Sequence, residues 1–140
     1  MNARFFLDTN IFVYSFDLSA PAKAKKAQQL IRNALTSRKG VISYQVAQEF
    51  FNVAFKRFTH PMTTAEAQQY LGAVFRPLLA IHSSAALYGE ALRTKETSRI
   101  SWYDALIVSA AIQSGCDRLY SEDLQHAQKF GNLQVVNPFV

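Results

Sequence analysis

Short apolar runs and longer amphipathic segments alternate along this chain of 140 residues. The runs hold three or four mostly hydrophobic residues, whereas in the longer segments apolar residues recur every three or four positions. The runs predict β-strands at residues 4–7, 41–43, 78–81, 118–121 and 133–136. Short continuous apolar runs are typical of strands that are buried on both faces of a parallel sheet.

The longer segments predict helices at residues 11–14, 21–35, 44–58, 64–75, 84–97 and 101–114. Asn10 stands near the expected cap of the first helix, Pro21 at the start of the second, and Pro77 and Gly115 after two of the others. These are the positions that each residue type favours at helix ends. Strands that alternate with helices of this length predict an α/β protein with a parallel sheet, here one domain over residues 1–140.

The composition narrows the class of protein. With 49% hydrophobic and 18% charged residues, the chain is typical of a globular protein. A single cysteine excludes an internal disulfide framework and a cysteine-rich zinc site. No apolar run reaches the roughly 18–20 residues that span a bilayer, and the first residues lack the apolar stretch of a signal peptide. We therefore expect a cytoplasmic protein with no membrane partner.

The net charge of +5 is unevenly distributed. Residues 1–60 hold nine basic and three acidic residues, and residues 61–140 hold six basic and seven acidic ones. A basic half favours a polyanionic partner, because binding releases the counterions of the phosphates. For the lysines of residues 23–26, a solvated helix face is the simpler explanation.

Two acidic residues follow predicted strands. Asp8 comes directly after the first strand, and Asp123 comes two residues after Ser121, which ends another. Because active sites of open parallel sheets form at the carboxyl ends of the strands, these two acids are expected to lie close together.

Two more acids lie on apolar faces of predicted helices. Glu49 falls three residues after Val46, and Asp104 falls three residues before Ile107. An unpaired carboxylate that faces the core is costly, and residues 101–117 contain no lysine or arginine to pair with it. A divalent cation would relieve the repulsion among acids gathered in one place.

Each of these acids also has a purely structural explanation. Asp8 would cap the first helix, Glu49 would flank its apolar stripe in solvent, and Asp123 would cap a helix after its strand. Asp104 would be the third-position acid of a capping box opened by Ser101. Their common placement, in a chain with only ten acidic residues, favours a shared site.

Four motifs in this order resemble the PIN domain, and most closely its toxin branch, VapC. They are Leu-Asp-Thr-Asn-Ile at residues 7–11, Gln-Glu-Phe at 48–50, Trp-Tyr-Asp-Ala-Leu-Ile at 102–107 and Leu-Tyr-Ser-Glu-Asp-Leu at 119–124. The likeness extends from Phe6 to Phe139. It implies a three-layer α/β/α fold with a short central parallel sheet of four to five strands.

The resemblance also implies a function. PIN-domain toxins are Mg²⁺- or Mn²⁺-dependent endoribonucleases, often homodimers, that a small antitoxin protein inhibits. The acidic positions of the family, which serve catalysis and metal binding, correspond to Asp8, Glu49, Asp104 and Asp123. The small polar position of the last motif corresponds to Ser121.

Three further positions qualify this assignment. Glu122 competes with Asp123 for the fourth acidic position, and we choose Asp123 because its spacing from Ser121 keeps the same strand-end direction. Asn10 is taken as a second supporting polar residue. Ala127 stands where the closest relatives would have glycine, at the start of an expected helix.

Three other functions remain open at this stage. The main alternative is a PIN-like module that binds RNA or protein without catalysis. A metal-free nuclease would use histidine and the RNA 2′-OH, would be insensitive to EDTA and would cut no DNA. His60, His82 and His126 are scattered and lack metal-ligand spacing, so surface or structural roles explain them more simply. A phosphatase with an Asp8 nucleophile would need a second aspartate where Asn10 stands.

Overall fold

A computed structural model describes residues 3–140 and confirms the alternation of strands and helices. The strands are β1 (Arg4–Leu7), β2 (Gly40–Ser43), β3 (Leu79–Ile81), β4 (Cys116–Tyr120), β5 (Lys129–Phe130) and β6 (Leu133–Val136). The helices are α1 (Thr9–Tyr14), α2 (Pro21–Ser37), α3 (Tyr44–Lys56), α4 (Thr64–Tyr70), the π-helix η1 (Leu71–Phe75), α5 (Arg76–Leu78), α6 (Ala85–Ser98) and α7 (Trp102–Gln113).

The strands form one sheet in the order β3-β2-β1-β4-β6-β5. Five strands are parallel, and β5 alone runs antiparallel, paired with β6. The expected four to five parallel strands are thus present, but a sixth strand at the edge was missed. With only two residues, β5 has too short a hydrophobic pattern to be read from the sequence.

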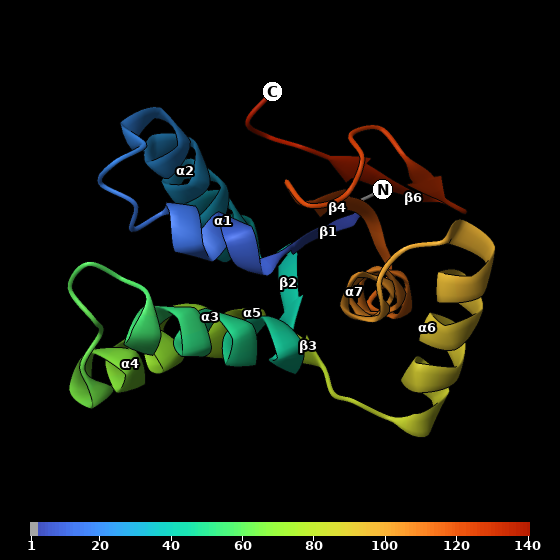
Figure 1. Ribbon diagram of the computed structural model, residues 1–140, viewed down its shortest axis with the longest axis horizontal. Coiled ribbons are helices and arrows are strands. Elements are labelled where there is room, and N and C mark those ends of the chain that lie inside the picture. The colour runs from blue at the N-terminus through green and yellow to red at the C-terminus, as the bar shows by residue number, and fades with distance from the viewer. Residues whose placement is uncertain (1–2) are drawn as a thin grey trace.

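Helices cover both faces of the sheet and give the expected three layers. In Figure 1, α6 and α7 lie on one side of the central strands, and α1 and α2 lie on the other. All residues from 105 to 111 of α7 are buried, since α7 lies between the sheet and α6. No helix within residues 3–140 has both the length and the apolar character needed to cross a membrane.

The core is built on the central strands and the helices beside them. Phe6, Ile42 and Leu119, from three neighbouring strands, are fully buried. Helix α2 approaches β2 closely at Gly40, where an added Cβ would lie 2.2 Å from the Cβ of Ala34. Glycine at this position therefore allows the helix to pack directly on the strand.

Two predicted helix boundaries were wrong. The first helix begins at Thr9, before the expected Ile11, because Asp8 rather than Asn10 is its N-cap. Pro77 does not end the helix after Phe75, since helical conformation continues through η1 and α5. Pro77 is the second residue of α5 and directly follows the π-helical turn, in which the Arg76 amide bonds the Leu71 carbonyl.

The helix expected near Ala127 is also absent from the described residues. Residues 121–128 form bends and turns instead. Ala127 has φ 69°, the left-handed region that favours glycine, which agrees with the expectation that glycine suits this position. Asp123 consequently caps no helix.

Candidate functional site

Asp8 lies at the carboxyl end of β1 and is buried, with 3% of its surface exposed. Its carboxylate accepts two hydrogen bonds: Oδ1 from the Thr9 amide at 2.7 Å, and Oδ2 from the Ser121 hydroxyl at 2.7 Å. The strand ends of β1 and β4 are therefore joined through this carboxylate. Asp8 is the N-cap of α1, as its structural explanation predicted, and it also lies at the edge where an active site is expected.

The surroundings of Asp8 disfavour its charge. Burial raises its pKa from 3.8 to about 7, against the opposing effect of its hydrogen bonds with Ser121 and Thr9. The negative charges of Asp123 and Glu49 raise the pKa further. Asp8 thus changes its protonation state near neutral pH, in the electrostatic field of two other acids.

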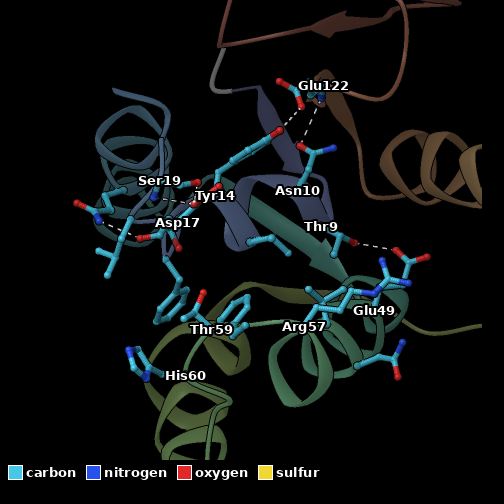
Figure 2. Close-up of a pocket in the computed structure, with 18 of the residues that line it drawn as sticks. Thr9, Asn10, Tyr14, Asp17, Ser19, Glu49, Arg57, Thr59, His60 and Glu122 are labelled. Atoms are coloured by element: carbon cyan, nitrogen blue, oxygen red, sulfur yellow. Dashed lines mark hydrogen bonds between the residues drawn. The ribbon is translucent and has the colours of Figure 1, made fainter. Parts of the chain in front are cut away.

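Glu49 projects from α3 toward α1 and is partly buried. The hydroxyl of Thr9 donates to its Oε1 at 2.7 Å, and the amide of Gln45 donates to its Oε2 at 3.3 Å. Figure 2 shows Thr9 and Glu49 joined across the two helices. These bonds fix the Glu49 carboxylate beside the Asp8 end of α1, so Glu49 is bonded on one side and faces the open groove on the other.

Asp104 lies in the first turn of α7 and is also partly buried. Its amide donates to the hydroxyl of the N-cap Ser101 at 3.1 Å. Within residues 3–140 its carboxylate makes no hydrogen bond, so only one half of the capping box is formed. Burial raises the Asp104 pKa, and the Asp123 charge adds to this effect.

Asp123 is exposed, in the segment that follows β4. Its amide donates to the Ser121 hydroxyl at 3.2 Å, and its charge acts on both Asp8 and Asp104. Asp123 therefore links Asp8, at the end of β1, to Asp104, in α7. We call Asp8, Glu49, Asp104 and Asp123 the acid cluster.

Glu122 points elsewhere. The hydroxyl of Tyr14 donates to its Oε1 at 2.6 Å, and the Lys23 ammonium contacts its Oε2 at 2.6 Å. Lys23 also lies over the rings of Tyr14 and Phe139, at 4.5 Å and 5.5 Å from their centroids. Because Lys23 compensates the charge of Glu122, the geometry supports Asp123 as the fourth acid.

Asn10 contributes a free donor beside the cluster. Its Oδ1 accepts from the backbone amide of Glu122 at 3.4 Å, as Figure 2 shows. Its Nδ2 is buried and has no hydrogen-bond partner in the described part of the chain. A buried donor without a partner is costly unless a ligand or water accepts from it.

A large open groove is lined by two of these acids, Glu49 and Asp123, whereas Asp8 and Asp104 lie outside its lining. It has a volume of about 1420 Å³ and passes between α1, the turn after it and the C-terminal end of α3 (Figure 2). Its lining includes the acids Glu49 and Asp123, the cation Arg57, and the aromatic residues Phe16 and Phe58. The groove thus offers acidic, basic and aromatic side chains to one extended ligand.

Comparison with protein families decides the identity of this fold. The model of the PIN domain matches residues 5–130. The chain belongs to the PIN domain family. A comparison with curated proteins found no match.

Solved structures share the PIN fold with this chain. A toxin-antitoxin complex from Klebsiella pneumoniae has a TM-score of 0.68 at 20% identity and covers 97% of this chain and 98% of its own. VapBC2 from Rickettsia felis, bound to a DNA fragment from its promoter, has a TM-score of 0.59 at 24% identity, with coverage of 94% and 96%. VapC20 from Mycobacterium tuberculosis, described as a sarcin-ricin loop cleaving toxin, has a TM-score of 0.58 at 21% identity, with coverage of 84% and 88%.

The oxygen donors of this PIN domain suit a hard divalent cation. Among residues 3–140, no three His, Cys, Asp or Glu side chains lie close enough together to hold a metal ion by themselves. Mg²⁺ keeps several of its waters and is commonly bound by only one or two carboxylates together with substrate phosphates. The buried Asp8, repelled by neighbouring acids, fits this mode of binding.

Sequence reasoning missed the residues that support the acids. Thr9 lies inside the first PIN motif and bonds Glu49, but the motif itself does not reveal this contact between two helices. Gln45 precedes Glu49 by four residues, a helical spacing at which side chains meet, and this signal was available. Lys23 and Glu122 are 99 residues apart, so no local pattern connects them.

Proposed function

We propose that this PIN domain is a metal-dependent endoribonuclease that hydrolyses RNA phosphodiester bonds and acts as the toxin of a toxin–antitoxin pair. The observation that carries the proposal is the buried Asp8 carboxylate, held by the Thr9 amide and the Ser121 hydroxyl and placed in the field of Asp123 and Glu49. Perturbed acids beside a groove are typical of catalytic sites. Membership in the PIN family supports the same reaction class.

The four acids would have different roles in metal binding and proton transfer. Asp8 and Asp104 would hold Mg²⁺ or Mn²⁺ directly, and Glu49 and Asp123 would complete its surroundings, directly or through water. A bound ion would supply Lewis-acid stabilisation of the phosphoryl oxygens and lower the pKa of a water. Either Glu49 or Asp123 would accept the proton of the attacking water. Ser121 holds the orientation of Asp8 by its hydrogen bond.

The groove would hold the RNA strand. Arg57 lines it and would pair with a phosphate, and the unpartnered Nδ2 of Asn10 would donate to a phosphate oxygen or to water. The groove has room for several nucleotides, whereas a small phosphate ester would leave most of it empty. The shape therefore favours a nuclease over a phosphatase.

The test compares Asp8→Asn with wild-type protein on a structured RNA. We expect Asp8→Asn to lower the cleavage rate by more than about 100-fold, because weakening even the outer support of a metal site costs about 10–100-fold. EDTA should stop cleavage by the wild type, and Mg²⁺ or Mn²⁺ should restore it.

Asp117→Asn is the matched control, since Asp117 lies at the other end of β4 and is near the guanidinium of Arg118. This variant should cleave RNA normally. Full activity of Asp8→Asn would contradict the proposal, and RNA binding without cleavage in any metal would indicate the non-catalytic alternative.

The proposed partners are a small antitoxin protein and a second copy of this chain. The structural neighbours from Klebsiella pneumoniae and Rickettsia felis, a toxin-antitoxin complex and VapBC2, support the first of these. We propose a cytoplasmic location, where such a pair would meet RNA. Expression of the chain alone in bacteria should arrest growth, and expression of Asp8→Asn should not.

A further inference from the structure

A second, smaller cavity is lined by residues of α3, α6, α7 and the end of β3, and it shares no lining residue with the groove. It has a volume of about 170 Å³, and its walls include Ser43, Tyr44, His82, Trp102 and Tyr103. We call it the aromatic pocket. We infer that it binds one unpaired base of the RNA that the cluster cleaves. The inference rests on the proposed function and adds a base-recognition site to it.

The walls of the aromatic pocket are flat rings. Tyr44 stacks on His82, with ring centroids 4.4 Å apart and planes 20° apart, and Tyr88 packs edge-on against Trp102 at 5.5 Å. Tyr44 and Tyr103 remain 39% and 62% exposed. Exposed aromatic faces are what proteins use to stack splayed-out RNA bases.

A buried hydroxyl without a partner lies in the same pocket. Ser43 is 4% exposed and lines the cavity, and its Oγ has no hydrogen-bond partner among residues 3–140. Ser43 is also the N-cap of α3, where serine normally accepts a bond from the helix, yet its side chain makes none. Since this oxygen is itself buried, a base reaches it only when the Ser43 side chain rotates toward the cavity, and the hydroxyl can then both donate and accept.

The aromatic pocket is connected directly to the acids. The Gln45 amide lines the pocket and donates to Glu49 Oε2 and to the Tyr103 carbonyl, both at 3.3 Å. Tyr103 immediately precedes Asp104. A base held between Tyr44 and Tyr103 would therefore have its own phosphate beside the cluster, and the pocket would select the nucleotide next to the cleaved bond.

The size of the aromatic pocket limits its occupant. Sites for drug-sized molecules begin at about 300 Å³, so a cavity of 170 Å³ takes a single heterocycle. The groove of 1420 Å³ would take the rest of the strand. Ring faces, a free hydroxyl and this volume together fit one nucleobase.

Trp102 makes the test direct, because it is the single tryptophan of the chain and lines the aromatic pocket. The fluorescence of wild-type protein in EDTA would be titrated with single-stranded hexamers of rA, rC or rU, and with a hexamer of abasic ribose phosphates. At least one base-bearing hexamer should quench Trp102, and the abasic hexamer should not. Equal quenching by the abasic hexamer, or none by any hexamer, would overturn the inference.

Variants test the individual walls. Tyr44→Ala should weaken hexamer binding about 5- to 150-fold, the range expected for loss of one stacked base. Ser43→Ala should change the preference among rA, rC and rU without lowering the melting temperature, because its hydroxyl bonds nothing in the described chain. Phe55→Ala is the matched control, since Phe55 is an exposed aromatic residue of α3 that lines neither cavity.

The outcomes separate this inference from the proposed function. Quenching by base-bearing RNA without any cleavage would refute the proposed nuclease activity and would still support base binding in the aromatic pocket. Metal-dependent cleavage with unchanged base preference in Tyr44→Ala and Ser43→Ala would refute the pocket and leave the nuclease. A change of molecular mass in Tyr44→Ala would mean that a second copy covers this surface, which also overturns the inference.

Discussion

At the scale of single residues, Asp8 combines a structural and a chemical task. It caps α1 through one carboxylate oxygen and receives the Ser121 hydroxyl on the other. Its burial makes the charged form costly, so the folded protein retains a proton on Asp8 up to about pH 7. The site thus stores unfavourable energy that a cation at this carboxylate would offset.

The cost of ionising the buried Asp8 should make the free energy of unfolding depend on pH. Between pH 3.8 and about 7, the folded chain binds a proton at Asp8 that the unfolded chain releases, so the contribution of Asp8 to stability falls as the pH rises through this window. Asp8→Asn should therefore be more stable than wild type at pH 8, by up to about 4 kcal/mol, and nearly equal to it at pH 4.

Urea denaturation at both pH values, without divalent metal, measures the difference. The exposed control Asp117→Asn should change stability little at either pH. Equal stability of Asp8→Asn and wild type at pH 8 would show that the burial of Asp8 carries no such cost.

At the scale of elements, a contact between distant parts of the chain helps to hold the segment after β4 in place. Glu122 is bound by Tyr14 from α1 and Lys23 from α2, and Phe139 packs on Tyr14 with ring centroids 5.1 Å apart. This contact helps to hold the backbone that carries Ser121 and Asp123. It joins the beginning of the chain, at Tyr14 and Lys23, to its end, at Glu122 and Phe139, which explains why sequence patterns alone did not reveal it.

The packing of α2 on β2 gives a second prediction. Gly40→Ala would place a Cβ 2.2 Å from the Cβ and 2.7 Å from the Cα of Ala34, so the helix must move. We expect a loss of about 1–3 kcal/mol in the free energy of unfolding, as for other overpacked cores. Urea denaturation at pH 7 would measure it.

Gly89→Ala is the matched control with the opposite expected sign. Gly89 lies within α6, and within residues 3–140 no atom beyond its own stretch of helix lies within 4 Å of the added Cβ. This variant should gain up to about 1 kcal/mol, since alanine favours a helix over glycine. A stable Gly40→Ala protein would mean that α2 does not lie so close to β2.

Most elements could be predicted from the sequence because their signals are local. Buried strands such as residues 4–7 and capped helices such as the one opened by Ser101 have the patterns that define them. The conformation of the chain at Pro77 and after Asp123 could not be predicted. Local preference favoured a helix end at Pro77 and a helix start near Ala127, and the folded chain has neither. That Asp8 and Asp123 lie near each other was predictable from their places after neighbouring strands. The residues that support the acids, such as Thr9 and Ser121, could not be assigned their contacts from the sequence.

At the scale of the whole molecule, the proposed RNA contact of the basic N-terminal half centres on one side chain, because only Arg57 of its nine lysines and arginines lines the groove. Arg57 lines the groove, whereas its exposed neighbour Lys56 does not. Binding of a single-stranded RNA hexamer in EDTA should weaken with salt, by a slope of about −0.7 in log K against log salt for each phosphate contact. Arg57→Ala should remove about one such contact.

Lys56→Ala has the same change in net charge and provides the control. Its salt slope should stay close to that of the wild type, because Lys56 lies outside the groove. Equal slopes for both variants would show that general charge, and not the groove, attracts the RNA.

The edges of the sheet restrict how this molecule can assemble. The outermost strands are β3, with three residues, and β5, with two. A long free edge acts as a template on which another chain adds a strand, and edges this short offer hardly any template. Neighbouring molecules are therefore expected to meet helix surfaces outside the two cavities, such as the exposed Leu92 of α6 and Ile112 of α7, rather than to extend the sheet. Short edges of this kind also protect the folded chain from amyloid-like stacking at high concentration.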